Sequence, residues 1–376
     1  MIQILLFFLA VTLQAQQPLR TKPVKKLIVS LGFRDWGAIT IAGNTVLAGH
    51  PNDGGGIYAI DGTTGKQKWF HVAPKSEGNP SVSRPAVVSG DTVLVCYGKY
   101  LVALSLATGR ERWRGPAPFD NSVPIIAGNM VYMTDAEGAL NALDLATGKI
   151  LWKTPFGENR NYCGGQPALR DGVLYSTAYF EPKGRHAIAV DAKTGAEKWR
   201  TFLKAEYART GVCLVRLIAT SEGVFATGDQ FLLSFDLATG TPRWEAKKQL
   251  RRDERGFPKG FALWSLTDAG SMLTALSDIG LHLIDKTTGA FAWTLPGKFT
   301  DRPMAVSGDI LYFIGQPDGV AVVSKSGMLH ALDLQARQIV WSFARAEDKY
   351  NWSFHHMAPF DNGLWVDHYG VLLKLQ

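Results

Sequence analysis

The chain has 376 residues, of which 46% are hydrophobic and 19% charged, and this composition excludes a disordered chain and a collagen-like fibre. Its net charge of +7 is a mild basic excess, too small to indicate a nucleic-acid partner. The 39 glycines, 11 tryptophans, 11 tyrosines and 19 phenylalanines favour sheets and tight turns over helices. We therefore expect an all-β protein.

An apolar segment opens the chain. Residues 2–13 are interrupted only by Gln3 and Thr12, and a polar stretch around Ala15 follows. The run is too short to span a bilayer and suits a secretory signal peptide, although a buried strand is the alternative. We expect residues 1–15 to be a signal peptide and residues 16–376 a single domain. The mature protein is expected to be a monomer that is soluble after export to the periplasm or extracellular space and that could associate with a membrane through a partner.

A repeated unit, Asp-x-x-Thr-Gly-x-x-x-Trp, recurs along the chain. Its tryptophans lie 39 to 49 residues apart, at Trp69, Trp113, Trp152, Trp199, Trp244, Trp293 and Trp341. A period of about 40 to 50 residues indicates a propeller or another repeat array. The glycine allows a positive φ and the aspartate can bind the turn backbone, so each copy predicts two strands joined by a turn. Two copies deviate, with Ser105 at the aspartate position and Arg337 at the glycine position.

The number of blades follows from the two ends of the chain. Each repeat has room for four short strands, because a second strand pair precedes each unit, as in residues 85–98 and 123–135. After Trp341 the chain holds three more strands and ends at Gln376, one strand short of a blade. Residues 25–30 form a strand without a partner of its own. We therefore predict an eight-bladed β-propeller of four-stranded blades, closed by the N- and C-terminal strands.

The repeated unit resembles the tryptophan-docking repeat of the pyrroloquinoline-quinone-like (PQQ-like) propeller superfamily. The resemblance covers nearly the whole chain after the apolar segment. One branch of the superfamily contains quinoprotein alcohol and glucose dehydrogenases, and another contains the non-catalytic BamB-type propellers of outer-membrane β-barrel assembly, which this length resembles better. In these proteins the tryptophans dock neighbouring blades. The resemblance therefore implies that the repeated Trp, Asp and Gly residues are structural.

Functional residues are expected where the copies differ, on the face where inner strands start and second strands end. Arg84 and Arg302 occupy matching positions, each just before a proline that opens an inner strand, and Gln166 lies near the same level. Two guanidiniums near the axis favour a carboxylate or phosphate ligand. The alternative is an inter-blade salt bridge or a solvated rim.

The longest inter-blade loop is strongly basic. Residues 247–259 contain six basic and two acidic residues. We interpret this loop as a docking loop for an acidic protein surface or an anionic envelope polymer, with a solvated surface as the alternative. The residues assigned to the contact are Lys247, Lys248, Arg251, Arg252 and Phe257.

Histidines gather where the last and first blades should meet. His355 and His356 open the last inner strand, and they are assigned to the ligand-binding face. A group of histidines and aspartates could hold a divalent metal or perform acid–base chemistry. The spacing matches no known ligand motif, so we favour a polar rim and assign no metal site. The other members of the group are His50, His368, Asp53 and Asp367.

The hypothesis that the protein is a quinoprotein enzyme would require a quinone-binding site. Trp264 and Trp352 lie near inner-strand starts and could stack a planar ring, while Arg84 and Arg302 could meet its carboxylates. The resembled dehydrogenases also use calcium and a catalytic carboxylate, and neither can be matched to residues of this chain. No catalytic residue is therefore assigned.

The cysteines also bear on this choice. Many of the resembled enzymes have an adjacent cysteine pair, whereas Cys96, Cys163 and Cys213 are scattered here. Whether Cys163 and Cys213 pair is left open. We expect a non-catalytic, exported propeller without a cofactor that binds a protein or an anionic polymer in the cell envelope. The alternative is a PQQ- and calcium-dependent dehydrogenase or a propeller that binds a small ligand.

Overall fold

The structure is a computed structural model of the whole chain. It describes residues 18–30, 37–50, 55–72, 82, 84–97, 100–116, 123–135, 139–155, 166–180, 184–203, 216–228, 231–246, 251–252, 258–259, 263–277, 279–299, 304–320, 328–343, 354–360, 362–368 and 371–376. The predicted signal peptide, Cys163 and Cys213 lie outside this part of the chain. Within it, no helix is long and apolar enough to cross a membrane.

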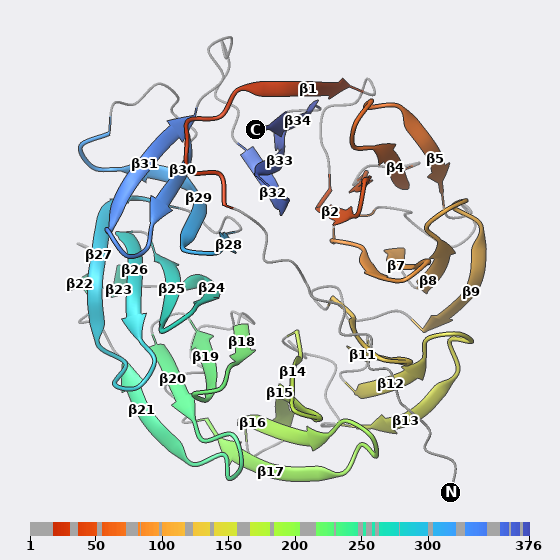
Figure 1. Cartoon of the computed structure of the whole chain (residues 1–376). Helices are drawn as coiled ribbons and strands as arrows, with labels where there is room; N and C mark the ends of the chain where they lie inside the picture. Colours follow the sequence, from red (N-terminus) through yellow and green to blue (C-terminus); the bar gives the residue numbers. More distant parts are fainter. Residues whose placement is uncertain are drawn as a thin grey trace, which may run out of the picture.

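The described strands form a closed ring of eight antiparallel blades around a common axis, which confirms the predicted fold class (Figure 1). Blade 1 consists of β2 (Ile39–Ala42), β3 (Thr45–Gly49), β4 (Ile57–Asp61) and β5 (Gln67–His71). Blade 2 consists of β6 (Val87–Ser89), β7 (Thr92–Tyr97), β8 (Tyr100–Ser105) and β9 (Glu111–Pro116). Blade 3 consists of β10 (Ile125–Ala127), β11 (Met130–Thr134), β12 (Leu140–Asp144) and β13 (Ile150–Thr154). Blade 4 consists of β14 (Ala168–Arg170), β15 (Val173–Phe180), β16 (Gly184–Asp191) and β17 (Glu197–Phe202).

The second half of the chain repeats this order. Blade 5 consists of β18 (Arg216–Ala219), β19 (Val224–Gly228), β20 (Phe231–Phe235) and β21 (Pro242–Ala246). A separate hairpin follows, formed by β22 (Arg251–Arg252) and β23 (Pro258–Lys259). Blade 6 consists of β24 (Trp264–Ala269), β25 (Met272–Ser277), β26 (Gly280–Asp285) and β27 (Phe291–Lys298). Blade 7 consists of β28 (Ala305–Ser307), β29 (Ile310–Pro317), β30 (Met328–Asp333) and β31 (Gln338–Phe343).

Blade 8 joins the two ends of the described chain. It consists of β32 (Phe354–Phe360), β33 (Gly363–His368), β34 (Val371–Leu375) and the N-terminal strand β1 (Lys25–Ser30). β1 pairs antiparallel with β34, with Ile28 opposite Leu373, and Val24 exchanges backbone hydrogen bonds with Gln376. The predicted closure by strands from both termini is confirmed. It gives β34 a partner along an edge that would otherwise be open.

The hydrophobic core lies between neighbouring blades. In one cluster Leu94 and Leu101 of blade 2 pack with Val131 and Leu143 of blade 3, and all four are almost fully buried. A four-stranded sheet is buried on both faces only when the next blade covers it. The ring therefore has as many small cores as it has blade interfaces.

The repeated tryptophans tie these interfaces together, as the resemblance implies. The indole N–H of Trp199 donates to the backbone oxygen of Leu237 in the next blade at 3.0 Å. A Cβ added at Gly240 would meet the Trp199 ring at 2.4 Å, and Gly240 has φ +69°, so the position requires glycine twice over. The equivalent indole bonds join Trp69 to Leu106, Trp113 to Leu145, Trp152 to Ala192, and Trp244 to Lys286.

The repeated aspartates organise the turns. Asp191 accepts hydrogen bonds from the backbone N–H and the hydroxyl of Thr194, both at 2.9 Å, and these bonds lower its pKa. In the deviating copy, Asp91 of the facing turn takes over, because its carboxylate accepts from Ala107 at 2.8 Å and from the hydroxyl of Ser105 at 3.0 Å. The aspartates of the repeat are therefore part of the turn structure.

A short N-terminal segment completes the last interface, which has no Asp-x-x-Thr-Gly turn. The indole N–H of Trp341 donates to the backbone oxygen of Leu19 at 2.9 Å, and the Leu19 N–H donates to the Tyr312 hydroxyl at 2.7 Å. Arg20 binds Asp333 at 2.9 Å and also pairs with Asp309. Residues 18–20, which we call the clasp, thus replace the missing turn.

The interface between blades 6 and 7 is different. Arg337 stands at the docking-glycine position with φ +56°, and within the described residues Trp293 makes no indole bond to the next blade. The two blades are joined instead through their strands: β27 pairs with β29, with Lys298 opposite Gln316. Beside this pairing, the Phe299 ring lies where a Cβ on Gly315 would be, at 2.3 Å. This interface is therefore tied through backbone pairing and a phenylalanine.

Candidate functional site at the loop face

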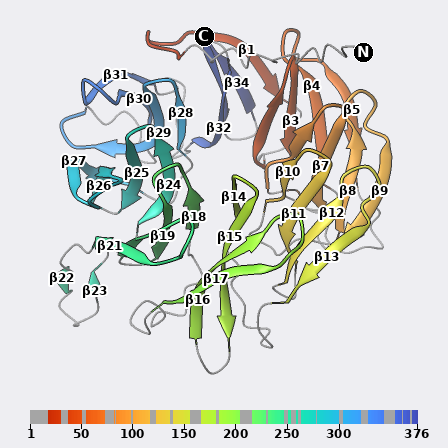
Figure 2. The same ribbon diagram turned by 60° about the horizontal axis from the view of Figure 1, so that its bottom comes forward.

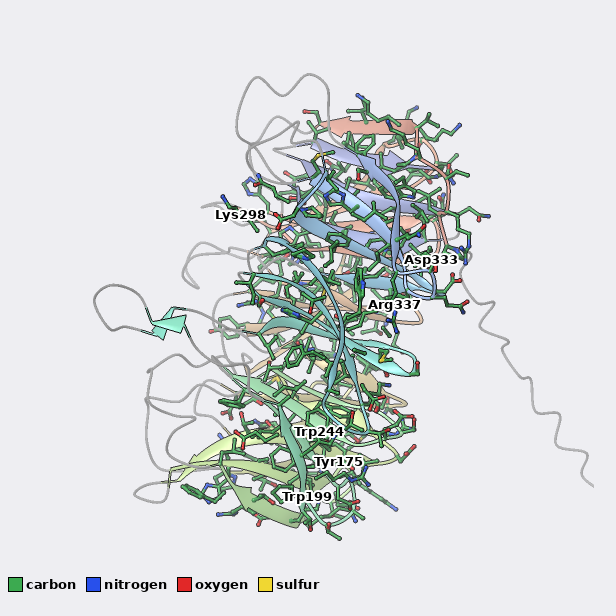
Figure 3. The ribbon with its side chains drawn as sticks, turned by 90° about the vertical axis from the view of Figure 1, so that its left-hand side faces the viewer. Tyr175, Trp199, Trp244, Lys298, Asp333 and Arg337 are labelled. Atoms are coloured by element: carbon green, nitrogen blue, oxygen red, sulfur yellow. The ribbon has the colours of Figure 1, made fainter. Side chains whose placement is uncertain are left out.

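The two faces of the disc differ in how regular they are. One face, the turn face, carries the short turns between first and second strands and the Asp-x-x-Thr-Gly turns, which contact each other: Asn44 donates to Asp61 at 3.0 Å. The opposite loop face carries the connections between blades and those between second and third strands. In the edge-on view, the cyan hairpin stands off one side of the disc, whereas Asp333 and Arg337 lie toward the other (Figure 3). Those predicted functional residues that the structure describes lie in or beside elements that end on the loop face: Arg84, Gln166, Arg251, Arg252, Trp264, His355 and His356.

Arg84 lies at the loop-face end of the inner strand of blade 2. The residue is half-buried. Burial raises the pKa of the thiol of Cys96, a free cysteine on β7, to about 12, and the positive charge of Arg84 lowers this pKa by a smaller amount. Two residues on, the Ala86 oxygen accepts a hydrogen bond from the Thr40 hydroxyl of blade 1 at 2.8 Å. Arg84 therefore lies just before the inner strand β6, and its role in binding stays a prediction.

The other two residues predicted to lie near Arg84, Gln166 and Arg302, are only partly described. Gln166 is exposed just before the inner strand β14, at the predicted level. Arg302 lies outside the described residues. The pairing of Arg84 with Arg302 around the axis stays a prediction.

The basic loop contains a hairpin. β22 and β23 pair antiparallel, with Arg251 opposite Lys259 and Arg252 opposite Pro258, and the hairpin joins no blade. Figure 2 shows it standing apart from the blades. Its register places two basic residues, Arg251 and Lys259, at directly opposite backbone positions. Lys247, Lys248 and Phe257 lie outside the described residues.

A buried carboxylate marks the loop-face end of blade 8. Asp367 is 2% exposed, accepts the backbone N–H of His356 and lies 3.5 Å from the His356 Nδ1. The bond is possible because β32 bulges between Phe354 and Met357 opposite β33, and a bulge re-aims side chains. Asp367 therefore orients His356. Among the described residues, no group of three or more His, Cys, Asp or Glu residues could hold a metal ion.

The aromatic residues proposed for ring stacking are only partly placed. Trp264 begins β24, but its side chain and those of His355 and His368 are not described, and Trp352 and Asp53 lie outside the described residues. β24 bulges after Trp264, and Ser265 there has φ +46° and is buried. Sequence reasoning missed both inner-strand bulges. The available signal was length, because β24 and β32 have six and seven residues where β6 has three.

A buried ion pair on the turn face was also missed. Lys286 is 4% exposed and its ammonium contacts Asp268 at 2.7 Å and Glu222 of blade 5 at 3.1 Å. Hydrogen bonds from Ser221, Thr220 and Lys286 lower the pKa of Glu222 to about 2. The sequence feature that could have predicted this ion pair is Lys286 itself, because it follows Asp285 at a position where most copies of the repeat have Leu or Ala.

The ring of tryptophan-docked blades defines a propeller of the PQQ-like superfamily. The sequence matches the profile of the family described as "Outer membrane protein assembly factor BamB" over residues 26–154 and 100–343. The chain belongs to this family, and the resemblance predicted from the repeat is confirmed.

Curated relatives agree with this family. The chain is 26% identical to the outer membrane protein assembly factor BamB of Burkholderia pseudomallei, over 61% of this chain and 62% of the relative. It is 31% identical to that of Legionella pneumophila, over 53% of each chain. A polyvinylalcohol dehydrogenase of Sphingopyxis is 24% identical over 81% of this chain and 60% of the relative. The chain thus spans about half the length of the curated relatives it matches.

Solved structures show the same fold. BamB from Moraxella catarrhalis superposes with a TM-score of 0.51 at 16% identity, covering 96% of this chain and 95% of that one. Quinohemoprotein alcohol dehydrogenase from Comamonas testosteroni superposes with a TM-score of 0.66 at 12% identity, covering 96% of this chain and 77% of that one. At these identities the likeness concerns the fold alone.

Proposed function

We propose that this protein is a non-catalytic, exported propeller scaffold that binds a protein partner, or an anionic polymer, in the cell envelope through its loop face. The observation that carries the proposal is the difference between the two faces of the ring. The repeated Trp, Asp and Gly residues are engaged in docking and turns, whereas the loop face carries Arg84 and the β22–β23 hairpin, which take no part in the repeated docking contacts. Fold alone does not fix function. Membership of the family, in addition to the fold, supports a role in the cell envelope like that of outer-membrane assembly factors.

The chemistry of the loop face suggests the kind of partner. Arg84 lies three residues before the inner strand β6, and Arg251 and Arg252 form one strand of a hairpin that is paired with no described blade strand. Arginine binds carboxylates and phosphates through two parallel hydrogen bonds. An acidic protein surface is therefore the preferred ligand of this face, with an anionic polymer as the other possibility.

The test is capture of the tagged mature protein from an envelope extract, followed by mass spectrometry of bound proteins and of bound small molecules. The proposal expects an envelope protein to be retained in a stoichiometric and salt-sensitive manner. Recovery of the intact protein from the cytosol, with its first residues uncleaved, would contradict export. N-terminal sequencing of the envelope form should begin near Gln16.

A quinoprotein dehydrogenase is the second candidate, favoured by the sequence similarity to a polyvinylalcohol dehydrogenase. Of the residues that such a site would use, Arg84 is described whereas Arg302 and Trp352 are not, and the described residues contain no group of three or more His, Cys, Asp or Glu side chains that could hold calcium. We derive no reaction step for it. The protein incubated with PQQ and calcium should neither shift the quinone absorbance nor oxidise alcohols or sugars. Turnover that disappears in Trp264→Ala or Trp352→Ala would establish the enzyme instead.

A further inference from the structure

A cavity lies on the turn face between blades 6 and 7, which we call the notch. Its volume is about 270 Å³, more than the roughly 150 Å³ of an apolar cavity that holds benzene. It lies at the interface where Arg337 replaces the docking glycine and Trp293 makes no indole bond to the next blade. The lining residues are Ala269, Gly270, Ser271, Met272, Leu283, Gly308, Asp309, Leu334 and Gln335.

The same position in the preceding interface is filled by a cation. Leu334 follows the turn aspartate Asp333, as Lys286 follows Asp285. Between blades 5 and 6 the Lys286 side chain is buried and its ammonium is held by Glu222 and Asp268. The first turn of blade 6 is two residues shorter than that of blade 5 and contains only Gly270 and Ser271, so it has no counterpart of Glu222. In blade 7, Val306 stands where blade 6 has Asp268. The notch is thus the Lys286 site without the lysine and without its two carboxylates, and Asp309 of the facing turn is the carboxylate that lines it.

The following interface holds a cation as well. Arg20 of the clasp pairs with Asp309 and Asp333 on the turn face of blade 7. The notch therefore lies between two cation sites of the same molecule. Carboxylates outnumber cations in this region: Glu222, Asp236, Asp268, Asp285, Asp309 and Asp333 against Arg20, Arg243, Lys286 and Arg337.

The lining suits a lysine side chain in both its parts. Met272, Leu283 and Leu334 offer apolar surface for the four-carbon stem. Asp309, Gln335 and Ser271 offer oxygens for the ammonium, which has three N–H donors and accepts no hydrogen bond. Asp309 has two carboxylate oxygens, so it can receive a second cation while it holds Arg20.

We propose that the notch binds a lysine side chain from an extended segment of a partner protein. This contact is on the turn face, so it is separate from the loop-face contact of the proposed function and would be a second attachment point. Either contact can fail without the other, because the substitutions that test them lie on opposite faces.

Three matched tripeptides serve as probes, Ac-Gly-Lys-Gly-NH2 and the same peptide with norleucine or glutamate in place of lysine. The melting temperature of the full mature protein is measured against peptide concentration at constant ionic strength. A ligand that binds only the folded state stabilises it by RT ln(1 + L/Kd), where L is the free ligand concentration, so the melting temperature keeps rising with the logarithm of ligand concentration above Kd. We expect a rise of this form with the lysine peptide, a smaller rise with norleucine, and none with glutamate.

Two variants fill the notch from within. Leu334→Lys should place a lysine side chain in the notch, where Asp309 is the lining carboxylate, so we expect a melting temperature no lower than that of the wild type and no response to the lysine peptide. Leu283→Phe should abolish the response by bulk alone. Leu237→Lys is the matched control: Leu237 occupies the same repeat position in blade 5, is partly buried in a packed cluster, and accepts the Trp199 indole bond. A lysine there should lower the melting temperature and keep the response.

Three results would overturn the proposal. Equal responses to lysine and norleucine would make the notch an apolar cavity without charge selection. A lysine response that survives in both filling variants would place the binding elsewhere. A response that appears only in a protein beginning at Pro18 would show that the residues before the clasp fill the notch; Pro18 already lies about 3.5 Å from the Cβ position of Gly308.

Discussion

Two interfaces of the ring show what the repeated unit does and what happens without it. Between blades 4 and 5, Trp199 stacks on Gly240 and donates its indole N–H to Leu237, so the contact is made on the turn face. Between blades 6 and 7, Arg337 carries a Cβ at the docking position, and the blades are tied by β27–β29 pairing around Lys298. The residue at the docking position decides whether the indole ring can approach the next blade: glycine leaves room for the ring, and a residue with a Cβ does not. The comparison teaches that each interface is fastened separately and can be fastened at either end.

The clasp supports the same conclusion from another direction. Leu19 supplies the carbonyl that a turn would supply, and Arg20 reaches Asp309, as Arg112 reaches Asp91 in blade 2. The residue before Trp341 is Val340, which is 40% exposed, so blade 7 lacks its own cation at the position of Arg112. Segments distant in sequence can therefore provide the groups that the docking chemistry requires.

Removal of the closing strand should have the largest effect. Deleting residues 371–376 removes β34, leaves β1 and β33 with unpaired edges, and opens the ring. We expect aggregation or loss of the cooperative unfolding transition, measured by size-exclusion chromatography and thermal melting. An unchanged melting curve would contradict closure by strands from both termini.

The two kinds of interface should differ under the same substitution. Trp199→Ala removes a large buried side chain and its hydrogen bond, so we expect a loss of about 3–5 kcal/mol in the free energy of unfolding. Trp293→Ala should cost less, because Trp293 lacks the indole bond and the β27–β29 pairing remains. Urea denaturation of both variants measures the difference. Equal losses would mean that the strand pairing does not replace the docking contact.

Blades 6 and 7 also differ from their neighbours in a buried histidine that faces the outer strand. His330 is fully buried, with its Nδ1 2.7 Å from the Ser342 hydroxyl, and burial lowers its pKa to about 4. In the unfolded chain this histidine has a pKa near 6.5 and therefore binds a proton more tightly than in the folded protein. The neutral His330 is thus compatible with full stability above pH 6.5, and the free energy of unfolding falls as the pH drops from 6.5 toward 4. The loss amounts to as much as about 3 kcal/mol.

The measurement is the free energy of unfolding between pH 7 and pH 4 in wild type and in His330→Asn. Asparagine is the residue that blade 3 uses at this position, Asn141, so the variant keeps a polar side chain that fits the site. We expect a shallower pH dependence in the variant. Identical slopes would show that other groups account for the acid sensitivity.

Restoring the docking glycine should have the smallest effect. Arg337→Gly relieves a positive φ that costs a residue with a Cβ about 1–2 kcal/mol, offset in part by the greater freedom of glycine in the unfolded chain. We expect a gain of about 0.5–1 kcal/mol, read from chemical denaturation. The control is Gly240→Ala, which places a methyl group against the Trp199 ring and should be destabilising. A destabilising Arg337→Gly would show that the arginine side chain holds this interface.

The repeat made much of the fold predictable. Gly and Asp have strict turn requirements and each tryptophan needs a neighbouring blade, so the blade number, the ring and the pairing of residues 25–30 with the C-terminal strand followed from the sequence. The clasp did not, because Leu19 and Arg20 act through contacts with residues some 300 positions away. The bulge that brings His356 to Asp367 has no periodic signal. Lys286 could have been singled out, but its partners Glu222 and Asp268 are brought together only by the ring.

The central claim is that the loop face binds the partner, whereas the repeated turns of the turn face dock the blades. The most direct measurement compares two triple variants in capture from an envelope extract. One neutralises the loop face with Arg84→Gln, Arg251→Gln and Arg302→Gln; the other neutralises exposed lysines of three turn-face turns with Lys66→Gln, Lys149→Gln and Lys193→Gln. The account predicts that the loop-face variant loses most of the captured partner and its salt dependence, while the turn-face variant, with the same charge change, retains both. Equal losses, or a loss confined to the turn-face variant, would contradict it.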